Sequence, residues 1–348
     1  MRPSAASRTR TDADLRQFAD DVAYYLTLEP RQLPSRYLYD DLGSALFESI
    51  CRLPWYRITR AEQGLLDGHA GEIVSRVGAL STLVELGPGS GEKLAAILRA
   101  ARAFERLTVH LVDVSAAALV AASRMLASTG GPDDLAIVTH QASYEAGLEE
   151  ATRDAAGSGR NASQEGGRRG SAGGGTGSGG TLTLFLGSNI GNFDPPGAGA
   201  FLRSVRAALA PGDALLIGAD LVKGRRELLL AYDDPLGVTA AFNRNLLVRV
   251  NRELDGDFDV DHFTHRAVWN GTKSRIEMYL VSTRNQRVRV RGAKLEFTFR
   301  AGETIWTESS YKYEPDEVVR MLRRAGFAHE AQWVDEPDRF ALTVAAAR

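Results

Sequence analysis

TLVELGPGSG, residues 82–91, is a short apolar run that ends in three closely spaced glycines. The residues that follow carry Leu94, Ile97 and Leu98 at the spacing of one helical face. Glycine allows positive φ and lets the backbone approach a ligand without a clash at Cβ. The stretch therefore predicts a strand, a ligand-binding turn and a helix.

The same alternation of strand and helix patterns continues along the chain after this stretch. Apolar runs at 107–112, 135–138, 182–186 and 214–218 predict further strands, and they alternate with helical patterns such as 116–126, which Ser115 can cap, and 201–209. A helix at 315–325 and strands at 331–334 and 340–344 close the chain. This alternation predicts an α/β fold with a doubly wound, mostly parallel sheet.

Two regions do not follow this alternation of strand and helix patterns, and they predict a second subdomain. Residues 1–60 and 222–312 combine a helical stretch at 242–250 with strand-like runs at 275–282, 287–290 and 295–300. We expect them to form a substrate-binding subdomain at the carboxyl edge of the sheet, whose own domain spans 61–221 and 313–348. Residues 157–180 are almost entirely Gly, Ser, Arg and small polar residues, which predicts a flexible surface insertion.

Composition narrows the class of protein. The 348 residues include 42 Lys and Arg and 44 Asp and Glu, giving a net charge of -2, which argues against a nucleic-acid binder and favours a small polar substrate. Cys51 is the single cysteine, so no disulfide can form within the chain. The sequence has no apolar leader and no uninterrupted apolar run near the roughly 20 residues of a membrane span. We expect a cytoplasmic monomer that binds neither nucleic acid nor membrane.

One cluster has a spacing that suits a metal. His262 and His265 are three residues apart, beside Asp257, Asp259 and Asp261. The local pattern is that of a loop or strand and not of a helix. We interpret the cluster as a solvated acidic surface and expect no metal.

The glycine turn narrows the choice of cofactor. Its pattern is Glu85-x-Gly87-x-Gly89-x-Gly91, and Asp113 ends the next strand, where a carboxylate can bind ribose hydroxyls. A dinucleotide fingerprint needs a glycine at position 92, which is a glutamate here. The pattern resembles the first motif of class I S-adenosylmethionine-dependent methyltransferases, so we expect that Rossmann-like sheet and that cofactor; a dinucleotide-dependent oxidoreductase remains the alternative of another class.

Further segments sharpen the resemblance. They are LPSRYLYD at 33–40, LPWYRITRAE at 53–62, FLGSNIGN at 185–192, AYDD at 231–234, AFNRN at 241–245, RIEM at 275–278 and TESS at 307–310. Together they resemble the histidine Nα-methyltransferases of ergothioneine biosynthesis, from about residue 30 to the end of the chain. The resemblance implies methylation of the α-amino nitrogen of L-histidine to its trimethylated form.

The resemblance also implies a role for individual residues. The cofactor positions are Glu85, Gly87, Gly89, Gly91, Lys93 and Asp113, with Ser143 and Tyr144 beside the adenine. The substrate positions are Asn192 and Tyr232 for the carboxylate, Glu308, Ser310 and Tyr56 for the imidazole, and Met278. The catalytic positions are Tyr39, near the amino group, and Gly187, whose carbonyl can face the amine.

The residue types suit this chemistry. Glu308 and Ser310 are two apart, so on a strand both point to one face, where a carboxylate and a hydroxyl can satisfy both nitrogens of an imidazole. Methyl transfer to a neutral amine is a displacement that needs alignment more than a strong base. We therefore expect Tyr39 or a water to relay the proton.

Two features depart from the family pattern. The family has an acidic-aromatic pair at the adenine, where this chain has Ser143-Tyr144. Asp194-Pro195-Pro196-Gly197 is similar to the motif of nucleic-acid amino-methyltransferases, but Gly197 replaces the aromatic residue that would stack on a base. Other readings remain open: a methyltransferase for another amino acid or for a thiolated histidine, and a silent fold that only binds histidine or betaine.

Overall fold

The computed structural model describes residues 12–165 and 179–348. They divide into two compact units, one made of the described residues up to Arg57 with Lys223–Lys312, the other of Ile58–Val222 with Tyr313–Arg348. Each unit is built from segments that are far apart in the chain. Among the described residues, every helix is too short or too polar to cross a membrane.

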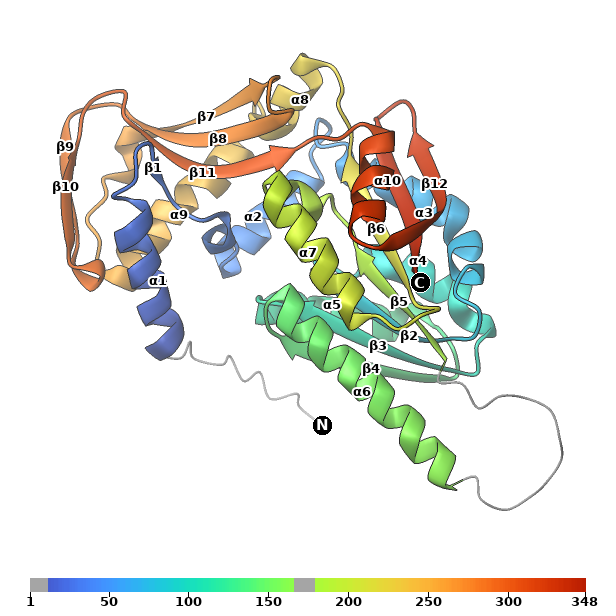
Figure 1. Ribbon diagram of the computed structural model, residues 1–348. Coiled ribbons are helices and arrows are strands. Elements are labelled where there is room, and N and C mark those ends of the chain that lie inside the picture. The colour runs from blue at the N-terminus through green and yellow to red at the C-terminus, as the bar shows by residue number, and fades with distance from the viewer. Residues whose placement is uncertain (1–11, 166–178) are drawn as a thin grey trace, which may run out of the picture. The chain divides into compact units, whose positions relative to one another are not determined.

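The second unit is built on a seven-stranded sheet (Figure 1). Its strand order is β12-β13-β6-β5-β2-β3-β4; the five strands β2 to β6 run parallel, and β13 runs antiparallel to both of its neighbours. The strands are β2 (Leu80–Leu86), β3 (Arg106–Asp113), β4 (Asp134–Gln141), β5 (Gly180–Phe185), β6 (Ala214–Asp220), β12 (Phe327–Asp335) and β13 (Phe340–Ala347). The predicted α/β class with a mostly parallel, Rossmann-like sheet is confirmed.

Helices cover both faces of this sheet (Figure 1). One layer consists of α3 (Ile58–Ser75), α4 (Glu92–Ala100) and α5 (Ala116–Thr129), with the short η2 (Ala101–Ala103) directly after α4. The other consists of α6 (Tyr144–Glu165), α7 (Pro195–Ala208) and α10 (Pro315–Arg324), with η3 (Asn189–Asn192) before α7. With helices on both faces, the central strands are buried on both sides, which is why they read as continuous apolar runs.

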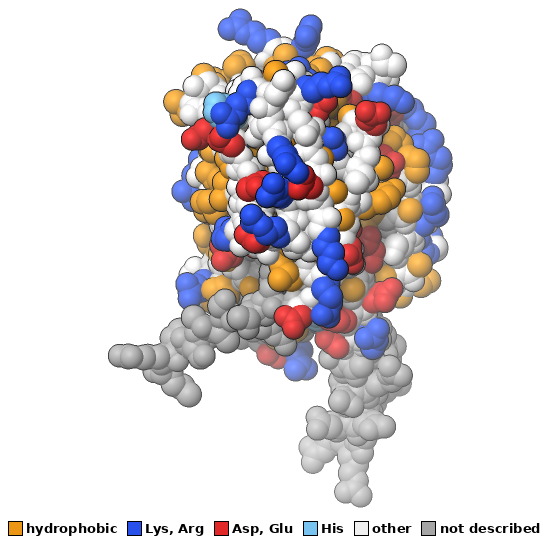
Figure 2. Space-filling model, turned by 90° about the vertical axis from the view of Figure 1, so that its left-hand side faces the viewer, with side chains coloured by type: hydrophobic (Ala, Val, Ile, Leu, Met, Phe, Trp, Pro, Cys, Tyr) orange, Lys and Arg blue, Asp and Glu red, His pale blue; other side chains and the backbone are white. Residues whose placement is uncertain are grey.

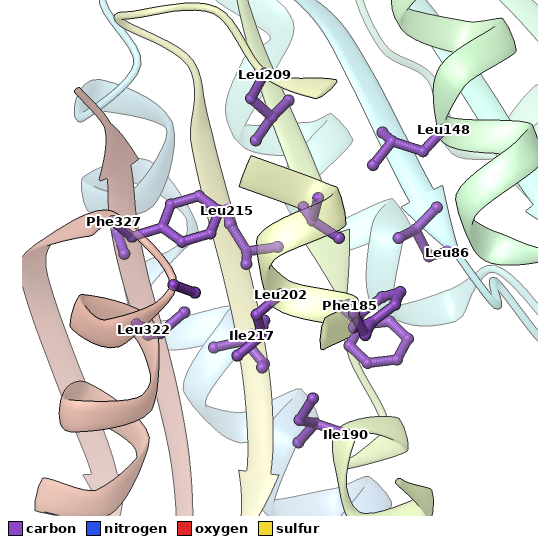
Figure 3. Close-up of a cluster of buried hydrophobic side chains, with 14 of the residues drawn as sticks. Leu86, Leu148, Phe185, Ile190, Leu202, Leu209, Leu215, Ile217, Leu322 and Phe327 are labelled. Atoms are coloured by element: carbon purple, nitrogen blue, oxygen red, sulfur yellow. The ribbon is translucent and has the colours of Figure 1, made fainter. Parts of the chain in front are cut away.

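The core between the sheet and the second helix layer fixes the ends of the central strands (Figure 3). Phe185, the last residue of β5, is fully buried, and its ring centroid lies 4.6 Å from that of Phe201 on α7. Leu86 at the end of β2 and Ile190 in η3 belong to the same cluster. Full burial of one such side chain contributes roughly 1.5–3 kcal/mol, so the loops that follow β2 and β5 start from well-anchored strands.

Helix starts in this unit are set by the local sequence. Ser115 caps α5 as predicted, with its hydroxyl accepting the N–H of Ala118 at 3.2 Å. Asp194 caps α7 by accepting the N–H of Gly197 at 2.8 Å, and Pro195 occupies the first turn. The Asp194-Pro195-Pro196-Gly197 motif therefore has a structural role as a helix start.

One boundary differs from the sequence prediction. Helix α6 continues to Glu165 and β5 begins at Gly180, so the segment expected to be a flexible insertion over 157–180 is helical in its first part. The preceding residues 144–155 already form the helix, and extending an existing helix costs much less than starting one. The rest of the predicted insertion, 166–178, lies outside the described residues.

The first unit joins two small sheets to four helices (Figure 1). The helices are α1 (Asp12–Tyr25), α2 (Asp41–Cys51), α8 (Arg225–Tyr232) and α9 (Val238–Leu254), with short turns η1 (Ser35–Leu38), η4 (Val260–His262) and η5 (Arg291–Ala293). A four-stranded sheet has the order β1-β11-β8-β7, and β9 pairs with β10 as a hairpin. The strands are β1 (Arg31–Gln32), β7 (Phe263–Asn270), β8 (Arg275–Ser282), β9 (Gln286–Val290), β10 (Leu295–Phe299) and β11 (Thr304–Tyr311).

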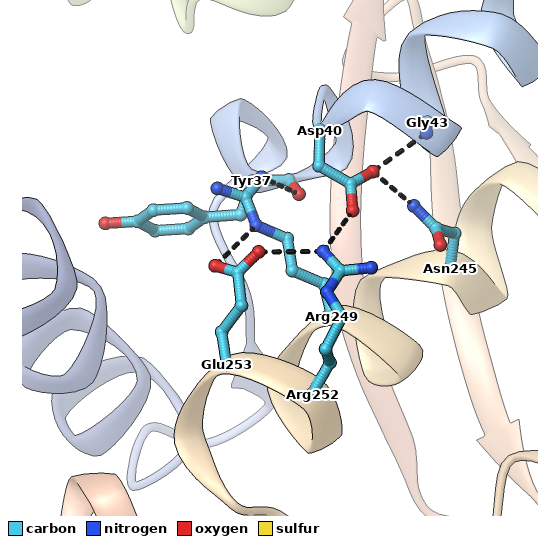
Figure 4. A network of polar contacts seen from close by, with 7 residues as sticks. All are labelled: Tyr37, Asp40, Gly43, Asn245, Arg249, Arg252 and Glu253. Carbon is cyan, nitrogen blue, oxygen red and sulfur yellow. Dashed lines mark hydrogen bonds and ion pairs between the residues drawn. The ribbon is translucent and has the colours of Figure 1, made fainter. Parts of the chain in front are cut away.

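A buried polar network ties the N-terminal segment of this unit to α9 (Figure 4). Asp40, the N-cap of α2, accepts from the Gly43 N–H at 2.8 Å, from Asn245 Nδ2 at 2.7 Å and from Arg252 at 2.6 Å. Arg249 donates to the carbonyl of Tyr37 at 2.6 Å. These contacts hold the backbone on both sides of Tyr39 against α9.

The histidines considered for a metal have other roles. His265 lies on β7, where its Nδ1 contacts Asn243 Nδ2 at 2.9 Å and its Nε2 contacts the carbonyl of Tyr232 at 2.8 Å. Its side chain is only 1% exposed, so the prediction of a solvated surface was wrong for this residue. His262 is in η4 and pairs with Asp259 at 3.8 Å. His265 instead supports the backbone of a predicted substrate residue.

Candidate active site

The turn after β2 has the geometry that its glycines predict. Gly87, Gly89 and Gly91 have φ values of 79°, 54° and 82°. A Cβ on Gly87 would lie 3.1 Å from the hydroxyl of Tyr144, and one on Gly91 would lie 2.9 Å from Cα of Ala122. The turn is therefore a backbone-lined cradle that a side chain would fill.

Glu85 precedes this cradle at the end of β2. Its side chain is buried, and Oε2 has no hydrogen-bond partner among the described residues. Burial raises the pKa of Glu85 to about 8, while the charge of Lys93 opposes that rise. An unsatisfied buried carboxyl oxygen beside a backbone cradle fits a ligand that brings its own hydrogen-bond donor.

Asp113 ends β3 beside β2 in the sheet. Its Oδ1 accepts the N–H of Ser115 at 2.8 Å, and burial raises the pKa of Asp113 to about 6. The carboxylate is thus ionised at neutral pH, and ribose hydroxyls are suitable donors to it.

Ser143 and Tyr144 lie at the start of α6. Ser143 Oγ accepts from the Ala146 N–H at 3.5 Å, a weak contact within its own helix. Tyr144 packs against Phe185 and Phe201 with centroid distances of 5.3 and 6.2 Å, and burial raises the pKa of its hydroxyl. Tyr144 thus supports the glycine cradle, and what contacts an adenine there stays a prediction.

Glu62 on α3 has a place in the site that the sequence did not reveal. Its carboxylate is fully buried, lies 2.5 Å from Lys93 Nζ and accepts the N–H of Gly187 at 2.9 and 2.8 Å with its two oxygens. Gly218 on β6 leaves the space for it, since a Cβ there would lie 1.9 Å from Glu62 Oε1. The carboxylate thus connects two predicted site residues, Lys93 and Gly187.

The loop after β5 carries the remaining predicted residues of this unit. Gly187 and Ser188 have positive φ values of 73° and 58°, which turn the chain into η3. Ser188 Oγ accepts the N–H of Asp220 at 2.9 Å and so anchors the turn to β6. Asn192, at the end of η3, is exposed.

In the first unit, β11 presents the predicted imidazole pocket. Glu308 is paired with Met278 across β8, which places the two side chains next to each other on one face. Burial raises the pKa of Glu308 to about 7, and the charge of Lys312 opposes that rise. Ser310 is on the same face, as the spacing of two predicted.

A hydrogen-bonded group surrounds Ser310. Its Oγ lies 2.8 Å from the hydroxyl of Tyr232, and Lys312 Nζ contacts the same two oxygens at 3.0 and 2.7 Å. All three side chains are buried. Sequence reasoning assigned no role to Lys312, although its place four residues after Glu308 on an alternating strand was a signal that could have identified it.

The predicted tyrosines gather in one aromatic cluster. Tyr39 packs edge-on against Phe47 and Phe242, each at 5.5 Å between centroids. Tyr56 lies 6.2 Å from both Phe47 and Tyr232. The structure therefore brings six predicted residues together in the first unit: Tyr39, Tyr56, Tyr232, Met278, Glu308 and Ser310. The other ten predicted residues, from Glu85 to Asn192, lie in the second unit around the ends of β2, β3, β4 and β5.

Comparison with known proteins places the chain in a family. The family described as histidine-specific, SAM-dependent methyltransferase matches residues 18–347. A histidine N-alpha-methyltransferase of Mycobacterium tuberculosis is 40% identical over 99% of this chain and 100% of its own length, and one of Mycolicibacterium smegmatis is 39% identical over 99% of each. The ergothioneine biosynthesis protein 1 of Neurospora crassa is 27% identical over 87% of this chain and 32% of its own length. With the match covering both units, the chain belongs to the histidine-specific, S-adenosylmethionine-dependent methyltransferases.

Proposed function

We propose that this enzyme methylates the α-amino nitrogen of free L-histidine to Nα,Nα,Nα-trimethylhistidine, using three molecules of S-adenosylmethionine, as a step of ergothioneine biosynthesis. The observation that carries the proposal is the pair Glu308 and Ser310, buried side by side on β11 next to Tyr232. The names of the relatives support the same substrate and pathway.

The pocket chemistry suits an imidazole. Glu308 offers a carboxylate that can accept a ring N–H, and Ser310 offers a hydroxyl for the other nitrogen. An amino acid whose side chain lacks ring nitrogens would leave both groups unpaired in a buried site. Such a mismatch costs roughly 10⁴-fold or more in selectivity where a site is built to hydrogen-bond its substrate.

The residues of the second unit fit S-adenosylmethionine. The glycine cradle gives room for close backbone approach, Glu85 offers an unsatisfied oxygen to an ammonium, and Asp113 suits ribose hydroxyls. Lys93 and the segment 143–144 complete the predicted contacts. When bound, the cofactor would supply a sulfonium methyl group, to which an amine nitrogen can bond as the neutral thioether leaves.

The reacting amine needs orientation and a neutral state. The Gly187 N–H, shared between the two oxygens of Glu62, anchors the backbone at Gly187, and the carbonyl of Gly187 is our proposed contact for the amine. A displacement at a methyl gains most of its acceleration from alignment, so no dedicated strong base is needed, and Tyr39 or a water takes the proton to solvent. The ring of Tyr39 also suits the quaternary ammonium of the product through cation–π attraction.

Surface charge agrees with a small-molecule substrate. On the face shown in Figure 2, basic and acidic side chains are interspersed and not gathered by sign. Nucleic-acid binding usually needs a basic stripe. We propose a monomer in the cytoplasm that binds neither nucleic acid nor membrane.

The test is incubation with S-adenosylmethionine and a panel of amino acids that includes histidine, thiolated histidine and tryptophan, followed by mass spectrometry. We expect one to three methyl groups on histidine. Glu308→Ala should lower kcat/KM for histidine about 100-fold or more while the Kd for S-adenosylhomocysteine stays unchanged, because the change removes only the imidazole acceptor. Methylation of another panel member with histidine untouched would replace the substrate assignment, and unchanged histidine kinetics in Glu308→Ala would remove the pocket assignment.

A further inference from the structure

Lys312 is a buried cation in the first unit that the proposed reaction has not used. It directly follows β11 and, with Glu308 and Ser310, continues the alternation of positions 308, 310 and 312 on one face. Only 2% of its surface is exposed. A lysine is almost never buried to this extent without specific partners, so its environment requires an explanation.

The hydrogen bonds of Lys312 act on two predicted substrate residues. Its Nζ donates to the hydroxyl of Tyr232 at 2.7 Å and to Ser310 Oγ at 3.0 Å, and it lies 4.6 Å from the centre of the Tyr232 ring. An ammonium only donates, so both hydroxyl oxygens must accept from it. Tyr232 and Ser310 are also 2.8 Å apart, so one of the two hydroxyls donates its hydrogen to the other. Only the hydrogen of the second hydroxyl is then left to donate to a ligand, because the ammonium already occupies one acceptor position on each oxygen.

The charge of Lys312 affects the ionisation of Glu308, the third residue on this face of the strand. Burial penalises the ionised form of Glu308, and the nearby ammonium favours it. An ionised Glu308 makes a charge-assisted hydrogen bond with an imidazole N–H, which is roughly twice as strong as a bond between neutral groups. Removing the cation would therefore shift Glu308 toward its neutral acid form, which is a weaker acceptor for the imidazole N–H.

We propose that Lys312 is a positioning and specificity residue of the histidine pocket, which favours the carboxylate form of Glu308, orients the hydroxyl of Ser310 toward the imidazole and orients that of Tyr232 toward the substrate carboxylate. The inference rests on the proposed function, because it concerns recognition of the same substrate. Lys312 contacts the pocket residues and not the reacting atoms, so its effect belongs to KM for histidine more than to kcat.

The test uses Lys312→Met, which keeps the length and removes the charge, with Lys273→Met in the exposed turn between β7 and β8 as the matched control. KM for histidine is measured from pH 6.5 to 9.5, and each value is divided by that of the unchanged enzyme at the same pH. We expect a ratio of about ten at pH 7, equal to about 1.4 kcal/mol, which falls as rising pH ionises Glu308 without help from the lysine. The Kd for S-adenosylhomocysteine should not change in either variant, and Lys312→Arg should restore most of the affinity.

Glu308→Gln provides the decisive cross-check, since it imitates a permanently neutral acid. Adding Lys312→Met to Glu308→Gln should raise KM much less than the same change does alone, because its electrostatic target is gone. If Lys312→Met does not bind S-adenosylhomocysteine, Lys312→Gln replaces it and should show the same pH-dependent ratio. A ratio that is the same at every pH, or additive effects in the double variant, overturns the inference while the histidine activity stands. Absence of histidine methylation in the unchanged enzyme overturns the proposed function, and the inference with it.

Discussion

Glu62 shows how one residue organises its surroundings. Its carboxylate is buried beside a lysine ammonium and receives one backbone N–H on both oxygens, so its desolvation is offset by three contacts from two partners. Breaking a buried pair by neutralising one partner costs about 3–5 kcal/mol, because the other charge is left without compensation.

Glu62→Gln should therefore lower the free energy of unfolding by about 3 kcal/mol and weaken binding of S-adenosylhomocysteine at least tenfold, as Lys93 and Gly187 lose their common anchor. Urea unfolding and isothermal titration measure the two effects. Glu72→Gln is the control on the same helix, because Glu72 is exposed and pairs with Arg76 at 2.6 Å; we expect a change within about 0.5 kcal/mol. Equal effects of the two substitutions would contradict the role of Glu62.

The titration of a single residue, Asp113, should make the affinity for S-adenosylhomocysteine depend on pH. Burial raises its pKa to about 6, so the carboxylate takes up a proton as pH falls through 6 and then no longer accepts from both ribose hydroxyls. Affinity for S-adenosylhomocysteine should thus be constant above pH 7 and decline below 6, by at most about tenfold per pH unit. Titration calorimetry from pH 5 to 8 tests this. Asp113→Asn should bind weakly with a flat profile, and a decline as steep as that of the unchanged enzyme would assign the titration to another group.

At the scale of secondary-structure elements, the sequence predicted the helices and strands whose residue pattern lies within a few neighbouring positions. The strand of residues 82–86, the Ser115 cap and the helix beginning at Pro315 follow from periodicity and capping within a few residues. Strand β11 was not delimited, because its TIWTESSY sequence is polar and its bulge between Trp306 and Glu308 breaks the alternation. Its pairing with β1, more than 270 residues away, leaves no local trace at all. Within the site, the same reason hid Glu62, which meets Gly187 across 125 positions.

The cap of α7 tests the structural role of the Asp194 motif. Asp194→Ala should cost about 1 kcal/mol of unfolding free energy, since the Gly197 N–H loses its acceptor, while kcat for histidine stays within about twofold. Thermal and urea unfolding measure the first quantity and methyl-transfer rates the second. Asp133→Ala, an exposed change before β4, serves as the control within about 0.5 kcal/mol. A collapse of kcat in Asp194→Ala would restore the catalytic interpretation of that motif.

At the scale of the whole molecule, each unit combines chain segments that the sequence separates by 90 residues or more. The prediction of an interrupted sheet domain came from the break in strand–helix rhythm, which is visible along the chain. What joins residues 12–57 to 223–312 was not visible, because it is made of buried side-chain contacts such as those of Arg249 and Asp40 (Figure 4). Such contacts depend on three-dimensional proximity, and a single sequence taken by itself carries no record of it.

Arg249 and Arg252 offer a matched pair for testing that join. The Arg249 side chain is 5% exposed and donates to the Tyr37 carbonyl, whereas that of Arg252 is 50% exposed. Arg249→Ala leaves the buried Tyr37 carbonyl without this donor and removes one of the two arginines that pair with Glu253. We therefore expect a loss of about 3 kcal/mol, faster hydrogen exchange in α2 and α9, and a higher KM for histidine through the loosened Tyr39. Arg252→Ala should cost less than about 1 kcal/mol, because an exposed ion pair contributes little. The strands β2 to β6 should keep their protection in both variants if the first unit loosens by itself. Exchange that rises equally in both units would mean that the network stabilises the chain as one cooperative body and does not specifically hold the histidine pocket.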